Sequence, residues 1–271
     1  MSNKLKLWIL AILSVGMLLL AAIVPPIPQP TSYHDFADSR DCFGIPNCFN
    51  VSSNFAFLFV GIAGLVFLLY DGVRSRKAFT LPSERWPFVI MFLNVALVCI
   101  GSAYYHLAPD NDRLVWDRLP IAIGIMALLA ATLNDRINPK AGTRLLPVLI
   151  AIGAGTVLNW HWSEQRGAGN LNFYIVVQFY SLLVIVLLGI FFPSRYTRGG
   201  DMYAALGFYA LAKIAEFTDR PIYALGHIIS GHTVKHLLAA CAIYWILRML
   251  RKREPLQGIM EEAVARPSGL P

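Results

Sequence analysis

The feature that most limits how this chain can fold is a series of eight apolar runs, each close to the length of a membrane-spanning helix. Such a helix needs about 20 mostly apolar residues to cross roughly 30 Å of hydrocarbon. Short polar, Pro- or Gly-containing segments separate the runs, and none shows the alternating pattern of a barrel strand. The runs cover residues 7–24, 54–70, 86–106, 119–133, 145–160, 173–192, 202–217 and 228–249.

Composition points to the same class of protein. Of the 271 residues, 56% are apolar and only 14% are charged, whereas soluble domains carry about 25% charged residues. The formal net charge of +7 does not indicate nucleic acid as a partner, because the basic residues lie in short segments between apolar runs. We therefore predict one all-α membrane domain surrounded by membrane lipids.

The positions of Lys and Arg predict the orientation of the helices. With a cytoplasmic amino terminus, 16 of the 23 basic residues lie on the cytoplasmic side, and Lys213 and Lys235 lie within apolar runs. This bias favours two cytoplasmic termini and an even number of crossings. The five basic residues on the outside are Arg40, Arg113, Arg118, Arg166 and Arg220. The first run could be a signal peptide, but its length and the lack of a clear cleavage site favour a retained helix.

Histidine and serine spacing suggests a metal site. His232 and His236 are four residues apart in the last apolar run, so on a helix both side chains share one face, as two ligands of one metal require. Such a pair is usually chance in a soluble helix, but ionisable groups inside a membrane span usually face a functional cavity. Ser102 and His106 have the same spacing. Asp117 precedes an apolar run, and this pattern is also that of a helix N-cap.

The predicted topology brings these residues to the same depth. His106 ends a helix that runs outward, Asp117 starts the next helix inward, and His232 and His236 lie in the first turns of a helix that also starts outside. Three imidazoles with an open position for water are typical of catalytic zinc. Asp117 would then transfer protons and Ser102 would stabilise an oxyanion. The alternative of a serine nucleophile, with His106 as its base, leaves the other two histidines without a role.

The combined pattern resembles a known family. A Ser-x3-His at a helix end, an Asp eleven residues later and a late His-x3-His are similar to the alkaline ceramidases of the CREST superfamily, which includes the adiponectin and progestin receptors. Residues 50–54 (Asn-Val-Ser-Ser-Asn) resemble the start of their first helix, and the resemblance covers about residues 35–250. It implies a zinc ion on His106, His232 and His236, with Ser102 and Asp117 catalytic. It also implies hydrolysis of ceramide to a fatty acid and a sphingoid base.

The same resemblance divides the chain. The family fold is a bundle of seven transmembrane helices, here with one additional N-terminal transmembrane helix. We expect that helix in residues 1–25, an extracytoplasmic loop in 26–53, the seven-helix domain in 54–250 and a disordered cytoplasmic tail in 251–271. Short loops favour a bacterial inner membrane, with the site near the periplasmic face.

The loop before the second run departs from the family. Animal ceramidases bind calcium through a Trp- and Glu-rich segment, whereas the matching region here offers Asp35, Asp38, Asp41 and Asn47. These hard oxygen ligands suit Ca²⁺, and a solvated acidic loop is the alternative.

The loop also contains Cys42 and Cys48, with a Gly and a Pro between them. A turn there would bring the two cysteines within bonding range, and an extracytoplasmic loop favours oxidation. A disulfide is expected, with two free thiols as the alternative.

The leading functional hypothesis is a zinc-dependent amidohydrolase that cleaves ceramide or a related lipid amide entering from the bilayer. An esterase or phospholipase would use the same site. A receptor of the adiponectin or progestin type is less consistent with a seven-helix core that begins outside. A transporter is disfavoured because no inverted repeat is visible and the polar residues gather at one face.

Overall fold

The structure of the chain, a computed structural model, describes residues 1–71, 75 and 77–256. Residues outside that part include Arg74, Arg76 and Arg266 of the predicted cytoplasmic set and the segment 257–271 of the predicted tail. The regular secondary structure of the described residues is helical, and they contain no strand beyond isolated bridges. The prediction of an all-α protein is confirmed.

Within the described residues, seven helical segments are long and apolar enough to cross a membrane. Two of them contain a short helix before the long one, and one contains a π-helical turn, Val176–Tyr180 (η3). In order they are α1 (Asn3–Ile23), α2 and α3 (Cys48–Ser52 and Phe55–Leu69), η2 and α5 (Pro82–Glu84 and Arg85–Leu107), α6 (Asn111–Arg136), α7 (Ala141–Gln165), α8 to α9 (Asn172–Ile175 and Ser181–Phe191) and α12 (Gly231–Lys252).

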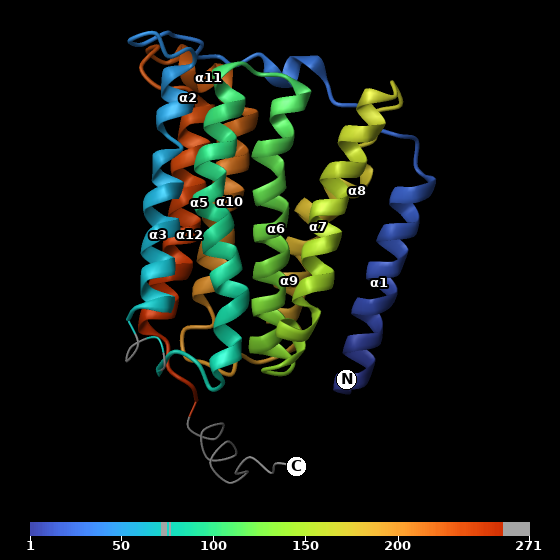
Figure 1. Cartoon of the computed structure of the whole chain (residues 1–271). Helices are drawn as coiled ribbons and strands as arrows, with labels where there is room; N and C mark the ends of the chain where they lie inside the picture. Colours follow the sequence, from blue (N-terminus) through green and yellow to red (C-terminus); the bar gives the residue numbers. More distant parts are fainter. Residues whose placement is uncertain (72–74, 76, 257–271) are drawn as a thin grey trace.

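The seventh predicted span, residues 202–217, forms α10 (Asp201–Phe217), which has 17 residues and packs beside α12. It is helical as predicted, but shorter than the other seven spans, and it carries Lys213 and Glu216. The remaining elements are the short helices η1 (Thr31–His34) and α11 (Asp219–Ala224). Both lie in the upper part of the molecule that connects helix ends (Figure 1).

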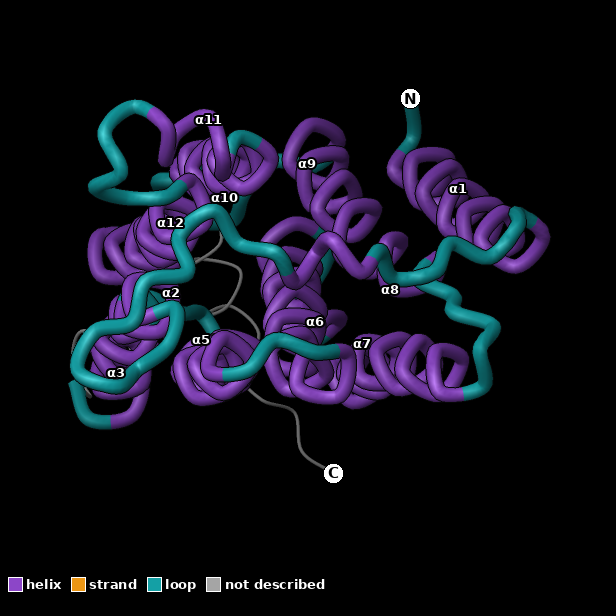
Figure 2. Tube along the Cα trace, turned by 90° about the horizontal axis from the view of Figure 1, so that it is seen from above, coloured by secondary structure: helices purple, strands orange, loops and turns teal. Residues whose placement is uncertain are grey.

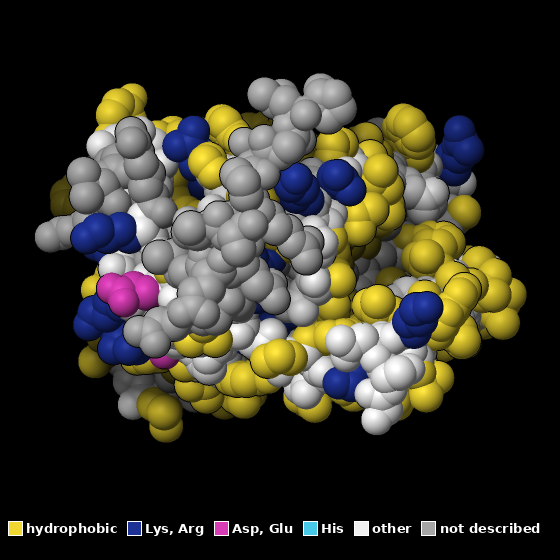
Figure 3. Space-filling model, turned by 90° about the horizontal axis from the view of Figure 1, so that it is seen from below, with side chains coloured by type: hydrophobic (Ala, Val, Ile, Leu, Met, Phe, Trp, Pro, Cys, Tyr) yellow, Lys and Arg dark blue, Asp and Glu magenta, His cyan; other side chains and the backbone are white. Residues whose placement is uncertain are grey.

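Six helices enclose one cavity. Its walls come from α3, α5, α6, the segment α8 to α9, α10 and α12, which are seen end-on in Figure 2. α1 stands at the edge of the molecule beside α8 and is mostly exposed (Figures 1 and 2). The N-terminus and the end of α12 lie at the same end of the bundle (Figure 1), which agrees with an even number of crossings. Figure 3 shows this end from below, with several Lys and Arg side chains on it.

The start of α6 corrects one expectation. Asp117 is not an N-cap, because the helix begins at Asn111 and Asp110 caps it by accepting a hydrogen bond from the Arg113 backbone at 2.7 Å. Asp117 therefore lies in the second turn, and Pro120 lies inside the helix. Proline has no backbone N–H, so the carbonyl of Trp116 loses its usual helical donor. That carbonyl faces α5.

Gly101 of α5 packs directly against the Trp116 carbonyl, where a Cβ would collide with the oxygen. This close approach positions Ser102 beside the turn that carries Asp117. We expect Gly101→Ala to destabilise the protein by about 1–3 kcal/mol through overpacking, as a lower unfolding temperature in detergent. Gly124→Ala on α6 is the control, because a Cβ there would meet its nearest neighbour at 3.9 Å. Equal unfolding temperatures of the two variants would contradict the close contact between Gly101 and the Trp116 carbonyl.

Two loop predictions are also resolved. Cys42 and Cys48 form the expected disulfide, with their Cα atoms 5.6 Å apart and Gly44 in the turn at a positive φ. The predicted tail begins too early, because α12 continues to Lys252 and the next residues pack against the loop before α10. The guanidinium of Arg253 lies 4.2 Å from the Tyr196 ring, and its stacking holds the chain there.

Candidate metal centre

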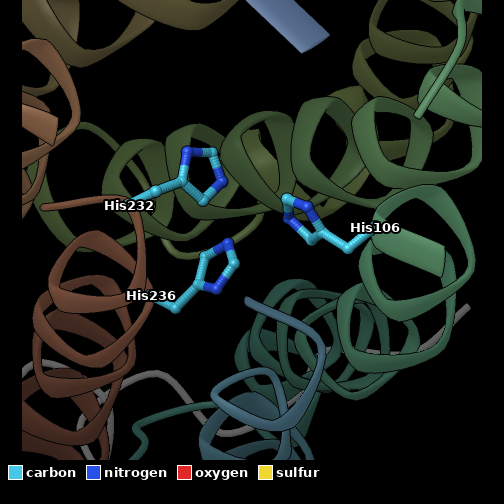
Figure 4. A group of neighbouring side chains, drawn as sticks. All are labelled: His106, His232 and His236. Carbon is cyan, nitrogen blue, oxygen red and sulfur yellow. The ribbon is translucent and has the colours of Figure 1, made fainter. Parts of the chain in front are cut away.

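Three histidines converge at the upper end of the bundle. Each of His106, His232 and His236 offers one ligand atom, and these atoms lie within 4.8 Å of one another. The ring centroids are 4.9–5.1 Å apart. Figure 4 shows the rings pointing toward one another, one from α5 and two from α12. All three side chains are buried, so the group could hold a metal ion.

The hydrogen bonding of the rings fits a metal. Both ring nitrogens of His106 are buried without a hydrogen-bond partner among the described residues, and such a buried polar atom is costly unless something binds it. Ser53 donates its hydroxyl to the Asn50 carbonyl at 3.1 Å, so its oxygen accepts from Nδ1 of His236 at 2.7 Å. This hydrogen bond leaves the lone pair of His236 Nε2 free to coordinate a metal ion. Metal-bound histidines commonly have such an outer partner.

The start of α12 is held in place by its neighbours. Ser230 caps the helix through the Thr233 backbone at 3.2 Å, and the backbone N–H of His232 donates to Asp219 at 2.7 Å. Gly231 packs so closely against the chain at Ala215 and Asp219 that a Cβ would collide. These contacts orient the first turn and therefore both histidines.

The loop and α2 close the site from above. Phe36 is buried, and its ring centroid lies 4.7 Å from that of His106 and 4.6 Å from that of His232. Asn47 donates to the His106 carbonyl at 2.9 Å, and the fully buried Asn50 accepts from the Thr233 hydroxyl at 2.9 Å. The segment 50–54, which carries the family resemblance, thus supports the histidines. Its sequence pattern was visible, whereas the position of Phe36 was not.

The cavity connects the histidines to the two proposed catalytic residues. Ser102, Asp117 and His236 all line it, and Ser102 and Asp117 are buried. Below them the walls become apolar, with side chains such as Met91, Leu128 and Ile246. The polar end of the cavity is therefore next to the metal group, and the apolar end extends into the bundle.

An ion-pair cluster lies at the same polar end. Lys213 pairs with Glu216 on α10, and Lys235 of α12 donates to the other oxygen of Glu216 at 2.9 Å. The ammonium of Lys235 also lies 3.1 Å from Nε2 of His232. Sequence reasoning missed this role of Lys235, because nothing local indicates which helix faces α10.

The four candidate calcium ligands do not come together. Asp35 pairs with Arg220, and the buried Asp38 accepts two hydrogen bonds from the Arg40 guanidinium. Burial raises the pKa of Asp38, but hydrogen bonds and charge from Arg40 outweigh it and leave that pKa below its usual value. Asp41 accepts from a loop backbone N–H at 2.9 Å, and the amide of Asn47 faces the His106 carbonyl. Each side chain has a protein partner, so the calcium hypothesis is not carried further.

The other histidines lie elsewhere. His34 bridges the Tyr105 hydroxyl at 2.9 Å and Asn111 at 3.0 Å. His161 contacts Gln165 on α7. His227 is exposed at a positive φ in the loop before α12.

Ser53 offers a test of the outer contacts. We expect Ser53→Ala to weaken zinc binding about 10–100-fold, because His236 loses the partner that orients its ring. Competition with a chromophoric chelator would measure the affinity. Ser52→Ala is the matched control, since Ser52 is the neighbouring exposed serine. Unchanged affinity in Ser53→Ala would show that the hydrogen bond does not support the site.

Together these features define, over the part of the chain that the structure describes, an all-helical architecture with seven candidate membrane-spanning helices and a buried group of three histidines that could hold a metal ion. Residues 58–255 match the model of a family described as "Family of unknown function (DUF6962)", and the chain belongs to this family. No curated protein and no solved structure matches the chain.

Proposed function

We propose that this protein is a zinc-dependent membrane hydrolase that cleaves the amide bond of ceramide or a related lipid amide. The observation that carries the proposal is the group of three histidines, of which His236 lines the polar end of a cavity together with Ser102 and Asp117. A metal group, a proton carrier and a hydrogen-bond donor thus meet where an apolar channel ends. This combination suits a substrate with a polar amide on a long alkyl chain.

The donor set favours zinc. Three neutral imidazoles match zinc, whereas calcium and magnesium prefer oxygen ligands. Three protein ligands also leave a coordination position open, as in catalytic sites. When bound, the metal would polarise the amide carbonyl and lower the pKa of a coordinated water toward ~7.

The buried side chains supply the remaining steps. Asp117 would accept the proton of the attacking water and deliver it to the leaving nitrogen. Ser102 would donate a hydrogen bond to the carbonyl oxygen as negative charge develops there. The overall reaction adds water across the C–N bond and yields a fatty acid and an amine, which is a sphingoid base when the substrate is ceramide.

The location follows from the charge pattern. The end of the bundle that holds the N-terminus and the end of α12 carries the excess of Lys and Arg, which favours a cytoplasmic position. The histidine group would then lie near the extracytoplasmic face, which is the periplasmic face in a bacterial inner membrane. A lipid amide could enter sideways from the bilayer, with its headgroup at that depth.

The test is a hydrolysis screen with purified protein in detergent. The panel would contain a short-chain ceramide, other N-acyl amines and a matched carboxyl ester, with fatty-acid release measured by mass spectrometry. We expect amide cleavage that stops on zinc removal and returns on zinc addition. The absence of amide cleavage by zinc-loaded protein would overturn the proposal, and cleavage of the ester alone would assign an esterase instead.

A further inference from the structure

One buried cation in the cavity has no carboxylate partner in the part of the chain that the structure describes. Arg118 of α6 is 5% exposed and lines the cavity next to Asp117. Its Nη2 donates to the Gln29 side chain at 2.6 Å, while its Nη1 has no hydrogen-bond partner among the described residues. No Asp or Glu of the described chain lies within ion-pair distance of it, whereas Arg136, Lys213 and Lys235 each have one.

Aromatic rings surround this guanidinium without neutralising it. Its central carbon lies 4.3 Å from the Trp160 ring centroid, 4.8 Å from that of Tyr174 and 5.3 Å from that of Tyr33. Such contacts make a buried Arg tolerable. They do not use its in-plane N–H groups, which are suited to carboxylate or phosphate oxygens.

The rest of the polar end also favours an anion. Lys213 and Lys235 share the single carboxylate of Glu216. With Arg118 and Asp117 included, three cations face two carboxylates around one cavity, and the formal surplus is one positive charge. A binding site for an entirely neutral lipid amide would not need that surplus, because buried charge is costly without a partner.

The apolar part of the cavity limits the length of the ligand's alkyl chain. From Ser102 to Met91 on α5, and from Asp117 to Leu128 on α6, the lining spans eleven residues. At about 1.5 Å per residue this is about 16 Å. An extended chain advances about 1.2 Å per bond, so one alkyl chain of about a dozen carbons fits.

We infer that Arg118 binds an acidic group on the amine part of the substrate, a carboxylate or a phosphate, so that among lipid amides the protein prefers single-chain N-acyl amines with an anionic headgroup. This inference rests on the proposed hydrolase function. For an N-acyl amino acid, the oxygen of water bonds to the acyl carbon and the C–N bond breaks. The nitrogen takes a proton, and the products are a fatty acid and an amino acid.

The test compares substrates that differ only in the headgroup. N-dodecanoylglycine, N-dodecanoylphosphoethanolamine and N-dodecanoylethanolamine carry a carboxylate, a phosphate and a neutral hydroxyl on the same acyl chain. We expect wild-type protein to prefer one of the two acidic substrates over the neutral one by about 10- to 100-fold in kcat/KM, as a charge-assisted hydrogen bond would provide. The preferred acidic substrate shows whether the headgroup is a carboxylate or a phosphate. A preference for the neutral substrate overturns the inference without any variant.

Variants then assign the preference to Arg118. Arg118→Gln should lower kcat/KM for the acidic substrate about 10- to 100-fold, mainly through KM, and leave the neutral substrate nearly unchanged. Arg118→Lys should retain part of the preference, because it keeps the charge but not the planar fork. Zinc content and unfolding temperature serve as controls for folding. An equal loss on both substrates would assign Arg118 a structural role and overturn the inference.

A binding measurement separates this inference from the proposed function. Zinc-free wild-type protein should be stabilised against heat more by N-dodecanoylglycine or the phosphate analogue than by the neutral amide, even if it hydrolyses none of them. If the protein hydrolyses neutral ceramide, but the acidic lipids neither bind nor react better, the hydrolase proposal stands and the role of Arg118 is wrong.

Discussion

Replacing any one of His106, His232 and His236 with alanine will remove the zinc and, with it, lipid-amide hydrolysis down to background. The wild-type protein should carry about one zinc per chain, held by three ligands as in catalytic sites. The three ring nitrogens lie within 4.8 Å of one another in a buried group, and two ligands alone hold zinc far less tightly. Elemental analysis of each variant, purified without chelators, measures the loss.

Two other histidines provide matched controls. His161→Ala and His227→Ala change residues on α7 and in an exposed loop, away from the group, and should keep both zinc and activity. His34 is a weaker control, because it bonds to Tyr105, the neighbour of His106. Freshly purified wild type without any transition metal would contradict the metal assignment.

Asp117→Asn should keep the zinc and the fold while losing about 10²–10⁴-fold in turnover, the usual contribution of a general acid–base group. The amide cannot accept the proton of the attacking water. The substitution is a clean test because Asp110, and not Asp117, caps α6, so the helix start is unaffected. The assay is hydrolysis of a short-chain ceramide, with zinc content measured on the same samples.

Ser102→Ala provides the companion measurement. Loss of one oxyanion donor should cost about 10²–10³-fold in turnover, again with zinc retained. Near wild-type turnover of Asp117→Asn would exclude Asp117 as the proton carrier. Loss of zinc in that variant would make Asp117 a ligand, and the three-histidine site would have to be redrawn.

Helix positions were predictable because they depend on local pattern. A run of about 20 apolar residues can satisfy its backbone in lipid only as a helix, so the spans follow from the chain itself. Helix ends were less predictable. The predicted start of the fourth span came eight residues late, because the polar residues Asn111–Arg118 belong to a helix whose first turns lie at the end of the bundle.

The histidine group was predictable for a related reason. A four-residue spacing puts His232 and His236 on one helix face, and the alternating direction of the spans places His106 at the same end. Both arguments need only the order of elements along the chain. The structure brings the three side chains together as those arguments require.

The hydrogen-bond and ion-pair partners of the polar side chains could not be predicted from local sequence patterns. Asp35 and Asp38 looked like calcium ligands, yet they face Arg220 and Arg40. Lys235 looked like an isolated charge in a helix, yet it joins Glu216 to His232. Apolar spacing and side-chain type are properties of a local segment and are visible in the sequence. Which charges meet, and which cation is left without a carboxylate, depends on how distant helices pack, because an ion pair or a hydrogen bond forms only over a few ångströms.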